Sequence, residues 1–337
     1  MNVKNILVIR RDNIGDLVCT TPLFESIKTL YPEANVYAYV NTVNAPVLKG
    51  NPHVEELFIY KKAKHRDEGE SVLSIYWQRF KTILKLRSLN IDTVILANPL
   101  PCKHSLKIAK KLGAKNIIGA EIEGDKAITH PFKPEDIDGN HHVENVCSYL
   151  KAFNKPIPTL PDIRIYPVDD EVKVMASKAG DLAAEEVVGI HISVRRPKNR
   201  WSVENYSKLM HMIAENKQAK FLLFWAPARA EDINDKGDDA RAEQLLELTK
   251  DLDVVAMPTA TVEELIAGFS LCDSVVCGEG GQMHLAAALK KKVLVFFGDT
   301  IVERWRPWCQ NYQLIKASDD NSDSISAEKA YEHYLKL

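Results

Sequence analysis

Hydrophobic and polar positions along the chain follow two patterns in turn. Short continuous apolar runs predict buried parallel strands, and longer stretches with apolar residues three or four positions apart predict helices. The predicted strands are 6–9, 36–40, 55–60, 92–97 and 116–119, then 187–192, 221–225, 254–256, 273–277 and 293–297. The predicted helices are 17–31, 45–49, 72–89, 105–112 and 143–153, then 169–183, one that begins after 202, 240–250, 262–270, 281–289 and 326–337. This alternation predicts an α/β fold with doubly wound sheets.

A proline-rich segment separates two such halves. Pro156, Pro158, Pro161 and Pro167 lie close together, and segments of this kind form extended connectors. The chain of 337 residues has the length of about two domains. We therefore expect one Rossmann-like domain over 1–160 and a second over 168–321, followed by a final helical segment over 322–337.

The composition is ordinary for a globular protein, with 45% hydrophobic and 27% charged residues. No apolar run approaches the ~20 residues that span a bilayer, and the start of the chain is not typical of a signal peptide. The six cysteines are scattered, which favours buried reduced thiols over disulfides or a zinc site. We expect a cytoplasmic protein, and peripheral contact with a membrane surface stays open.

Charge is distributed unevenly between the halves. Residues 1–165 carry 23 Lys and Arg against 18 Asp and Glu, whereas residues 166–337 carry 21 against 28. A cationic first half suits an anionic partner such as a phosphorylated glycolipid or a membrane surface. Charge alone does not separate that interpretation from an ordinary solvated face.

The first candidate site follows the opening strand. Ile6–Ile9 turns into a polar segment that contains Arg10 and Asn13, and Gly15 and Asp16 then introduce a helix. Ligands of open α/β sheets bind at the carboxyl ends of the strands. Asp16 is therefore either a carboxylate at the working edge of the first domain or a helix-capping residue.

The second candidate site follows the predicted strand 273–277. Gly278, Gly280 and Gly281 allow the backbone to approach a ligand closely, and the helix that starts there presents free N–H groups that suit a diphosphate. In this interpretation His284 donates a hydrogen bond to a phosphate oxygen, and Glu279 accepts one from a sugar hydroxyl. The alternative is a glycine-rich loop with a core histidine.

A basic loop over 193–200 forms the third candidate. Arg195, Arg196, Lys198 and Arg200 follow the end of a predicted strand, and such a group can clamp an anion. Simple surface exposure is the alternative. The segment 298–300 follows another strand end and faces the same edge of the predicted sheet.

Several function classes are excluded by missing motifs. The opening turn has no G-x-G-x-x-G, which argues against a nicotinamide dehydrogenase. The chain has no Walker lysine motif, no G-x-S-x-G elbow and no H-E-x-x-H helix, which argues against P-loop kinases, common hydrolases and zinc proteases.

The motifs together resemble those of the heptosyltransferase family, glycosyltransferase family 9. The opening stretch 6–22, with Gly-Asp followed by Thr-Thr-Pro, is similar to the N-terminal signature of that family. The segment GEGGQMHLAAA at 278–288 is similar to its C-terminal Gly-Gly-x-x-His-Leu-x-x-Ala motif, and 297–305 continues the likeness. The order and separation of these motifs fit over nearly the whole chain.

This resemblance implies a GT-B fold, in which the first domain binds the acceptor, the second binds a nucleotide-sugar, and the helix over 322–337 packs back on the first domain. It implies transfer of heptose from ADP-heptose to the lipopolysaccharide inner core, with inversion and without a metal or other cofactor. Asp16 matches the position of the catalytic base, and the residues expected near the acceptor are Arg10, Asn13, Gly15 and Thr20.

The resemblance also implies a set of donor-binding residues. The family has an aspartate where this chain has Glu279, and a lysine where it has Asn199, so we carry the phosphate role to Lys198 with Arg200 as its substitute. Glu231 matches an acid that contacts the ribose. The full expected donor set is Ser193, Lys198, Arg200, Glu231, Glu279, Gly280, Gly281 and His284.

Inverting transfer without a metal needs a base for the attacking hydroxyl, and it needs cations and N–H groups for the departing diphosphate. The sequence offers both. The partners expected are a nucleotide-sugar and an anionic glycolipid or core oligosaccharide, with no nucleic acid. Two alternatives stay open: transfer of another nucleotide-activated hexose or deoxysugar to a surface glycan, and a non-catalytic sugar-binding relative.

Overall fold

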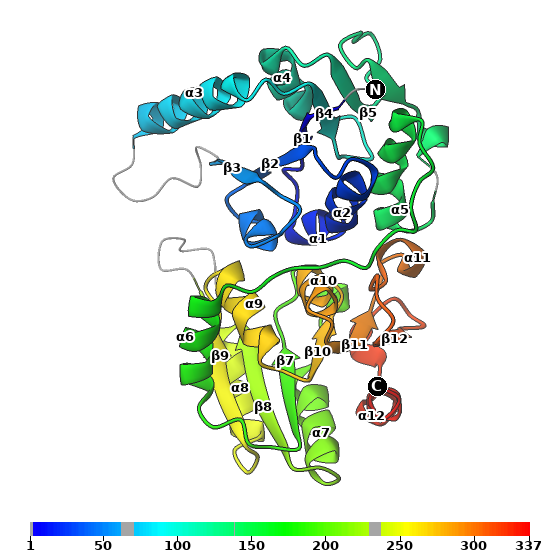
Figure 1. Cartoon of the computed structure of the whole chain (residues 1–337). Coiled ribbons are helices and arrows are strands. Elements are labelled where there is room, and N and C mark those ends of the chain that lie inside the picture. Colours follow the sequence, from blue (N-terminus) through cyan, green and yellow to red (C-terminus); the bar gives the residue numbers. More distant parts are fainter. Residues whose placement is uncertain (1–2, 62–70, 138, 229–236) are drawn as a thin grey trace. The chain divides into compact units, whose positions relative to one another are not determined.

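The computed structural model describes residues 3–61, 71–137, 139–228 and 237–337. The chain divides into two compact units, Met1–Ile165 and Tyr166–Leu337 (Figure 1). The division falls inside the proline-rich segment.

The first unit is built on a parallel sheet with the strand order β3-β2-β1-β4-β5-β6. In chain order its elements are β1 (Asn5–Ile9), α1 (Ile14–Val18), α2 (Thr21–Leu30), β2 (Asn35–Asn41), η1 (Ala45–Leu48), β3 (Glu56–Tyr60), α3 (Val72–Ser88), β4 (Thr93–Leu96), α4 (Lys103–Leu112), β5 (Asn116–Ala120), β6 (His130–Phe132), η3 (Pro134–Asp136), α5 (His142–Cys147) and η4 (Ser148–Phe153). Leu86 of α3 and Leu106 of α4 pack with Leu7 and Ile9 of β1 in one core cluster. Helices α2 and α5 contact each other.

The second unit repeats this topology. Its sheet has the order β12-β11-β10-β7-β8-β9, so that counting from the first strand of either unit gives the order 3-2-1-4-5-6 typical of Rossmann folds. Its elements are α6 (Asp169–Ala179), β7 (Glu186–His191), η5 (Pro197–Asn199), α7 (Val203–Ala214), β8 (Ala219–Trp225), α8 (Asp239–Leu248), β9 (Val254–Pro258), α9 (Val262–Ser270), β10 (Ser274–Gly278), α10 (Gly281–Ala288), β11 (Lys292–Phe297), α11 (Val302–Trp305), β12 (Tyr312–Lys316), η6 (Ser322–Ser324) and α12 (Ala327–Tyr334). The predicted α/β class with two Rossmann-like domains is confirmed.

The predicted helix over 17–31 is divided in the structure into α1 and α2. Pro22 stands in the first turn of α2, where a missing backbone N–H costs nothing. The Thr20 and Thr21 hydroxyls donate to the carbonyl oxygens of Asp16 and Val18, at 2.8 Å in each case. Side chains that bond the preceding turn in this way compete with a continuous helix.

The last helix packs on its own unit, which differs from the expectation that 322–337 packs back on the first domain. Helix α12 contacts α7, β11 and β12, and its residues Ala327, Ala330 and Tyr334 belong to the core of the second unit. The Tyr334 hydroxyl donates to Glu186 at the start of β7, at 2.7 Å. Burial of this tyrosine and its hydrogen bond hold α12 in place.

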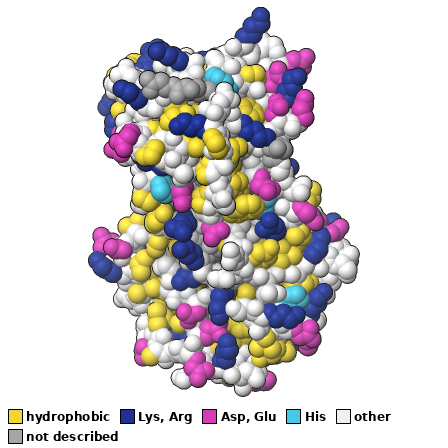
Figure 2. Space-filling model, turned by 45° about the vertical axis from the view of Figure 1, so that its right-hand side comes forward, with side chains coloured by type: hydrophobic (Ala, Val, Ile, Leu, Met, Phe, Trp, Pro, Cys, Tyr) yellow, Lys and Arg dark blue, Asp and Glu magenta, His cyan; other side chains and the backbone are white. Residues whose placement is uncertain are grey.

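Two short edge strands, β6 and β12, were absent from the sequence-based prediction. Strand β6 is three residues long and contains Pro131, which suits only a sheet edge. No helix in the part of the chain that the structure describes is long and apolar enough to cross a membrane. Basic and acidic side chains are interspersed on the face that Figure 2 draws.

Candidate active site

The loop after β1 is held in place by amides from β2 and the turn that follows it. Asn41 donates to the carbonyl oxygens of Arg11 and Asp12 at 2.9 and 2.8 Å, and Asn44 donates to that of Asp12 at 3.2 Å. Both amide side chains are buried. Because buried polar groups are costly unless paired, these bonds fix the direction in which the chain leaves the strand.

Asp16 lies in the first turn of α1, at the carboxyl end of β1, and its two oxygens have different partners. Its Oδ1 accepts a hydrogen bond from Arg10 Nη2 at 2.7 Å and lies 3.3 Å from His142 Nε2. Its Oδ2 accepts from the side chain and the backbone N–H of Asn13, at 2.9 and 3.3 Å. Asp16 therefore closes a capping box, and the same carboxylate belongs to an ion cluster.

The environment of Asp16 favours its ionised form. Burial by itself would raise the pKa of Asp16, but the hydrogen bond from His142 and the charge of Arg10 outweigh burial and hold the pKa well below its usual range. Arg10 and His142 are nearly inaccessible, whereas 14% of the Asp16 side chain remains exposed. A carboxylate that favours its ionised form is thus partly exposed to solvent, while the two residues that hold it are buried.

A second carboxylate shares the same arginine. Asp12 Oδ2 lies 3.3 Å from Arg10 Nε and accepts a hydrogen bond from Asn98, the second residue after β4. Burial raises the pKa of Asp12 in spite of the nearby Arg10. The pKa values of the two aspartates beside the buried Arg10 guanidinium are therefore shifted in opposite directions, that of Asp12 upward and that of Asp16 downward.

The other residues expected near the acceptor differ in exposure. Asn13 is exposed, whereas Gly15 is buried inside the short helix α1. Thr20 is fully buried and bonded to the Asp16 carbonyl, so its hydroxyl supports the turn. Arg10 is also buried and orients Asp16, since its Nη1 is bonded to the carbonyl oxygen of Ala97.

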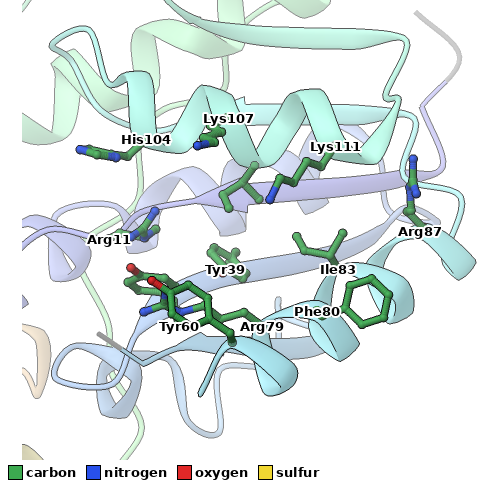
Figure 3. A pocket seen from close by; sticks show the side chains of 12 residues that line it. Arg11, Tyr39, Tyr60, Arg79, Phe80, Ile83, Arg87, His104, Lys107 and Lys111 are labelled. Carbon is green, nitrogen blue, oxygen red and sulfur yellow. The ribbon is translucent and has the colours of Figure 1, made fainter. Parts of the chain in front are cut away.

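A cationic, aromatic pocket opens beside this loop, within the first unit. Its volume is about 510 Å³. Figure 3 shows Lys107 and Lys111 reaching it from α4, and Arg79 and Phe80 from α3. Arg11 and Arg79 stack on the ring of Tyr60, at 3.7 and 4.3 Å from its centroid. The lining residues are Arg11, Tyr39, Tyr60, Tyr76, Arg79, Phe80, Ile83, Arg87, His104, Lys107, Ile108 and Lys111.

In the second unit, Glu279 is tied into a buried polar cluster. Its Oε2 accepts hydrogen bonds from the Asn199 amide and from the Thr300 hydroxyl, the latter at 2.8 Å. Asn199 also donates to Thr300 at 3.1 Å and accepts from the Gly298 N–H at 2.9 Å. Burial raises the pKa of Glu279, although the bond from Thr300 and the charge of Arg196 oppose that effect.

Two glycines allow the loop over 193–200 to lie directly on the strand ends. A Cβ at Gly298 would come within 2.1 Å of the Lys198 carbonyl oxygen, and one at Gly278 within 2.4 Å of the Asn199 carbonyl oxygen. Neither contact is possible for another residue without movement of the backbone. The segments 193–200, 278–281 and 298–300, which follow three strand ends at one edge of the sheet, are thus packed together.

Gly280 and Gly281 form the start of α10, as expected. Gly280 has φ 159° and ψ −168°, a conformation that side chains avoid, and a Cβ there would clash with Gln282. The α10 N-terminus therefore begins with unobstructed backbone. His284, one turn further on, is 2% exposed, and its ring lies 6.1 Å from that of Trp305.

The remaining predicted donor residues have distinct positions. The Ser193 hydroxyl accepts a hydrogen bond from the Ala226 N–H at 2.9 Å. Lys198 is exposed, whereas Arg200 donates to the Val194 carbonyl at 2.7 Å and lies 3.6 Å from Asp238. Glu231 lies outside the described residues.

No group of three or more His, Cys, Asp or Glu side chains that could hold a metal occurs among residues 3–61, 71–137, 139–228 and 237–337. Asp251 and Asp253 have the Asp-x-Asp spacing of some metal sites, but they pair instead with His211 at 3.2 Å and with Lys220 at 3.6 Å.

Three residues of these clusters escaped the sequence-based reasoning. His142 joins Asp16 from 126 positions away, and its only local signal was a pair of histidines before a helix. Asn199 looked like a gap in a row of cations, yet it is the fully buried centre of its cluster. Thr300 was noted only as part of a strand-end turn, and it closes the same cluster.

Known proteins are similar to this chain in sequence and in structure. Residues 79–335 match the family described as glycosyltransferase family 9 (heptosyltransferase). The chain is 27% identical over 312 residues to lipopolysaccharide heptosyltransferase 3 of Escherichia coli K12, covering 88% of this chain and 83% of that protein. The family 9 glycosyltransferase structure from Veillonella parvula DSM 2008 has a TM-score of 0.81 at 15% identity, over 99% of this chain and 96% of that one.

A further solved structure is an E. coli heptosyltransferase with ADP-2-deoxy-2-fluoro heptose, which has a TM-score of 0.74 at 18% identity and covers 98% of this chain and 99% of that one. Together with the two sheets of identical order, these structures define the fold as that of a GT-B glycosyltransferase. The family match spans most of the sequence. The chain belongs to glycosyltransferase family 9, the heptosyltransferases.

Proposed function

We propose that this glycosyltransferase transfers a heptose from ADP-heptose to a saccharide acceptor of the lipopolysaccharide core, with inversion and without a metal. One relative is named as a lipopolysaccharide heptosyltransferase, and one solved relative carries an ADP-heptose analogue. The observation that carries the proposal is the ionised, partly exposed carboxylate of Asp16, held at a strand end by Arg10 and His142.

In the proposed reaction, Asp16 acts as the general base. The acceptor hydroxyl oxygen attacks the anomeric carbon and its proton passes to the Asp16 carboxylate, while the bond from that carbon to the diphosphate oxygen breaks. The low pKa of Asp16 keeps its carboxylate ionised, so the position that receives the proton is vacant before transfer. Arg10 and His142 act as positioning residues, because they contact the carboxylate rather than the reacting atoms.

The second unit supplies what a leaving diphosphate needs. The backbone N–H groups at the start of α10, at Gly281 and Gln282, would bind phosphate oxygens, and Lys198 and Arg196 are exposed cations of the adjoining loop. Glu279 is anchored by one oxygen to Asn199 and Thr300. Its other oxygen would accept a hydrogen bond from a sugar hydroxyl.

The cationic pocket of the first unit suits the acceptor. Core saccharides that carry phosphate or carboxylate groups would pair with Arg79, Lys107 and Lys111, and the tyrosine rings would stack against sugar faces. Its wall includes Arg11, five residues before Asp16. The proposal assigns the protein to the cytoplasm, where nucleotide-sugars are made available.

The test is transfer by the Asp16→Asn variant, which keeps the size of the side chain and much of the helix cap. We expect a loss of at least ~100-fold in turnover, since general bases contribute about 10²–10⁴-fold. Binding of ADP-heptose, measured by calorimetry, should stay within about threefold of the parent. Asp125→Asn, which removes a partly exposed carboxylate of the same unit, is the matched control.

Four outcomes would contradict the proposal. Unchanged turnover in Asp16→Asn would show that Asp16 is not the general base. Turnover with another nucleotide-sugar but none with ADP-heptose would change the donor and favour transfer of another hexose or deoxysugar. Donor binding without transfer to any core acceptor would favour a non-catalytic binding protein. Loss of activity after chelation by EDTA would contradict the metal-independent reaction.

A further inference from the structure

Helix α3 carries a row of large hydrophobic side chains that face solvent. Leu73 is 80% exposed, Tyr76 and Trp77 are each 57% exposed, Phe80 is 50% exposed and Leu84 is 46% exposed. Their spacing places all five on one side of the helix. The rings of Trp77 and Phe80 stack with their centroids 5.5 Å apart. We refer to these five side chains as the α3 outer face.

The opposite side of the same helix already packs on the protein. Ile75 and Leu86 are fully buried, and Leu86 belongs to the core cluster beneath the sheet. The core therefore does not require the α3 outer face. Figure 1 shows α3 at the edge of the first unit, with its N-terminal half extending beyond the sheet. An exposed row of this size marks an interaction surface rather than scattered surface residues.

The surroundings of the α3 outer face are strongly basic. Helices α3 and α4 together contain eight Lys and Arg and no Asp or Glu, namely Arg79, Lys81, Lys85, Arg87, Lys103, Lys107, Lys110 and Lys111. Lys85 and Lys110 pair with Glu56 and Asp125 of neighbouring elements. The others give this side of the unit an excess of positive charge beside its apolar row.

We propose that α3 docks on an anionic lipid bilayer, with the α3 outer face inserted among the lipids and the basic side chains at the headgroups. Trp, Tyr, Phe and Leu beside Lys and Arg are the residues that place helices at membrane interfaces. The charge selects this occupant over a second copy of the chain, because a symmetric pairing through α3 would bring two basic surfaces together with no Asp or Glu on α3 or α4 to offset them.

The pocket in Figure 3 is continuous with this surface, because Tyr76 and Phe80 belong to both. A molecule anchored in the bilayer could therefore reach the pocket with its polar headgroup while its acyl chains stay in the lipid. The docking itself does not rest on the proposed transfer reaction. It is tested on vesicles that contain no saccharide acceptor and no nucleotide-sugar.

The experiment is flotation of the full chain with vesicles of phosphatidylcholine, alone or with phosphatidylglycerol. We expect binding that requires phosphatidylglycerol and weakens as salt is raised. The Leu73→Ser, Trp77→Ser double variant lies outside the pocket lining and should bind at least ~10-fold more weakly, since two large apolar side chains are lost from the contact. Lys81→Glu with Lys103→Glu should weaken binding to the anionic vesicles, since two cations of the contact are reversed.

The matched control is Val174→Ser with Leu248→Ser, which replaces exposed hydrophobic residues of the second unit, 50% and 41% exposed. It should bind like the parent, and circular dichroism should show all variants folded. Parent protein that stays off anionic vesicles would overturn the proposal. So would equal binding by the Leu73 and Trp77 variant, or a solution dimer that this variant dissociates.

Discussion

The two units share one strand order but bring different chemistry to the same edge of the sheet. In the first unit, side chains form the working groups: Arg10, Asp12, Asp16 and His142 meet where β1 ends. In the second unit, backbone groups take this place. Gly278, Gly280 and Gly298 have no side chain, so the loops and the start of α10 can lie close together. In the proposed reaction the first unit provides a carboxylate as proton acceptor and the second provides N–H groups for a diphosphate, so one scaffold would serve two kinds of chemistry.

The largest expected effect concerns the backbone side of this comparison. In Gly298→Ala, the new methyl group would meet the Lys198 carbonyl oxygen at 2.1 Å. We expect the free energy of unfolding to fall by about 3 kcal/mol, at the upper end for overpacking because the opposing atom is backbone. Equilibrium unfolding in denaturant measures this change in the free energy of unfolding.

Gly124→Ala in the first unit is the control for that substitution. Gly124 has φ +77° but nothing within 4 Å of a new Cβ, so only the backbone strain of about 1–2 kcal/mol applies. If the free energy of unfolding falls equally in the two variants, the close contact between Gly298 and the Lys198 carbonyl oxygen is not what stabilises the second unit.

The next effect concerns Asn199, a buried amide of the second unit. Asn199→Ala removes hydrogen bonds to Glu279, Thr300 and Gly298. We expect a loss of about 2–3 kcal/mol in stability, because buried partners are left unsatisfied, and weaker ADP-heptose binding by calorimetry. Asn216→Ala, on the surface, should change neither quantity. Unchanged affinity for ADP-heptose in Asn199→Ala would show that the cluster of Asn199, Glu279 and Thr300 does not contribute to donor binding.

The smallest effect concerns the support of Asp16. In the proposed reaction the ionised form of Asp16 is the active one, so turnover is expected to fall as pH drops through its pKa, which Arg10 and His142 hold low. In His142→Gln, the acidic limb of the pH–turnover profile should move upward, toward the ordinary value of about 3.9. Stability should be affected in the same direction, since a carboxylate with a depressed pKa stabilises the fold above that ordinary value and loses the contribution as pH falls.

His53→Gln is the control for this pH experiment, because His53 lies in the same unit and pairs with Glu25 at 3.8 Å. Its profile should match that of the parent. If His142→Gln also leaves the acidic limb in place, the contact with His142 is not part of what keeps Asp16 charged.

Much of the fold and the location of both candidate sites followed from local patterns. Apolar runs and helical spacing identified most strands and helices, since buried parallel strands and amphipathic helices differ in period. The prolines marked the division into units, and Asp16 and the glycine-rich segment 278–281 were found because each lies between a predicted strand and the helix that follows it. The short edge strands β6 and β12 were missed because few of their residues are apolar and buried.

By itself, then, the sequence determined the α/β class, the two units and the strand ends at which chemistry could occur, because these depend on residues close together in the chain. Only the tertiary structure decided that His142 contacts Asp16, that Asn199 is buried beside Glu279, and that Tyr334 anchors α12 to β7. Such contacts join residues some 80–150 positions apart. They arise from the packing of whole helices and strands, so they cannot be predicted from the hydrophobic period or from the spacing of residues within one segment.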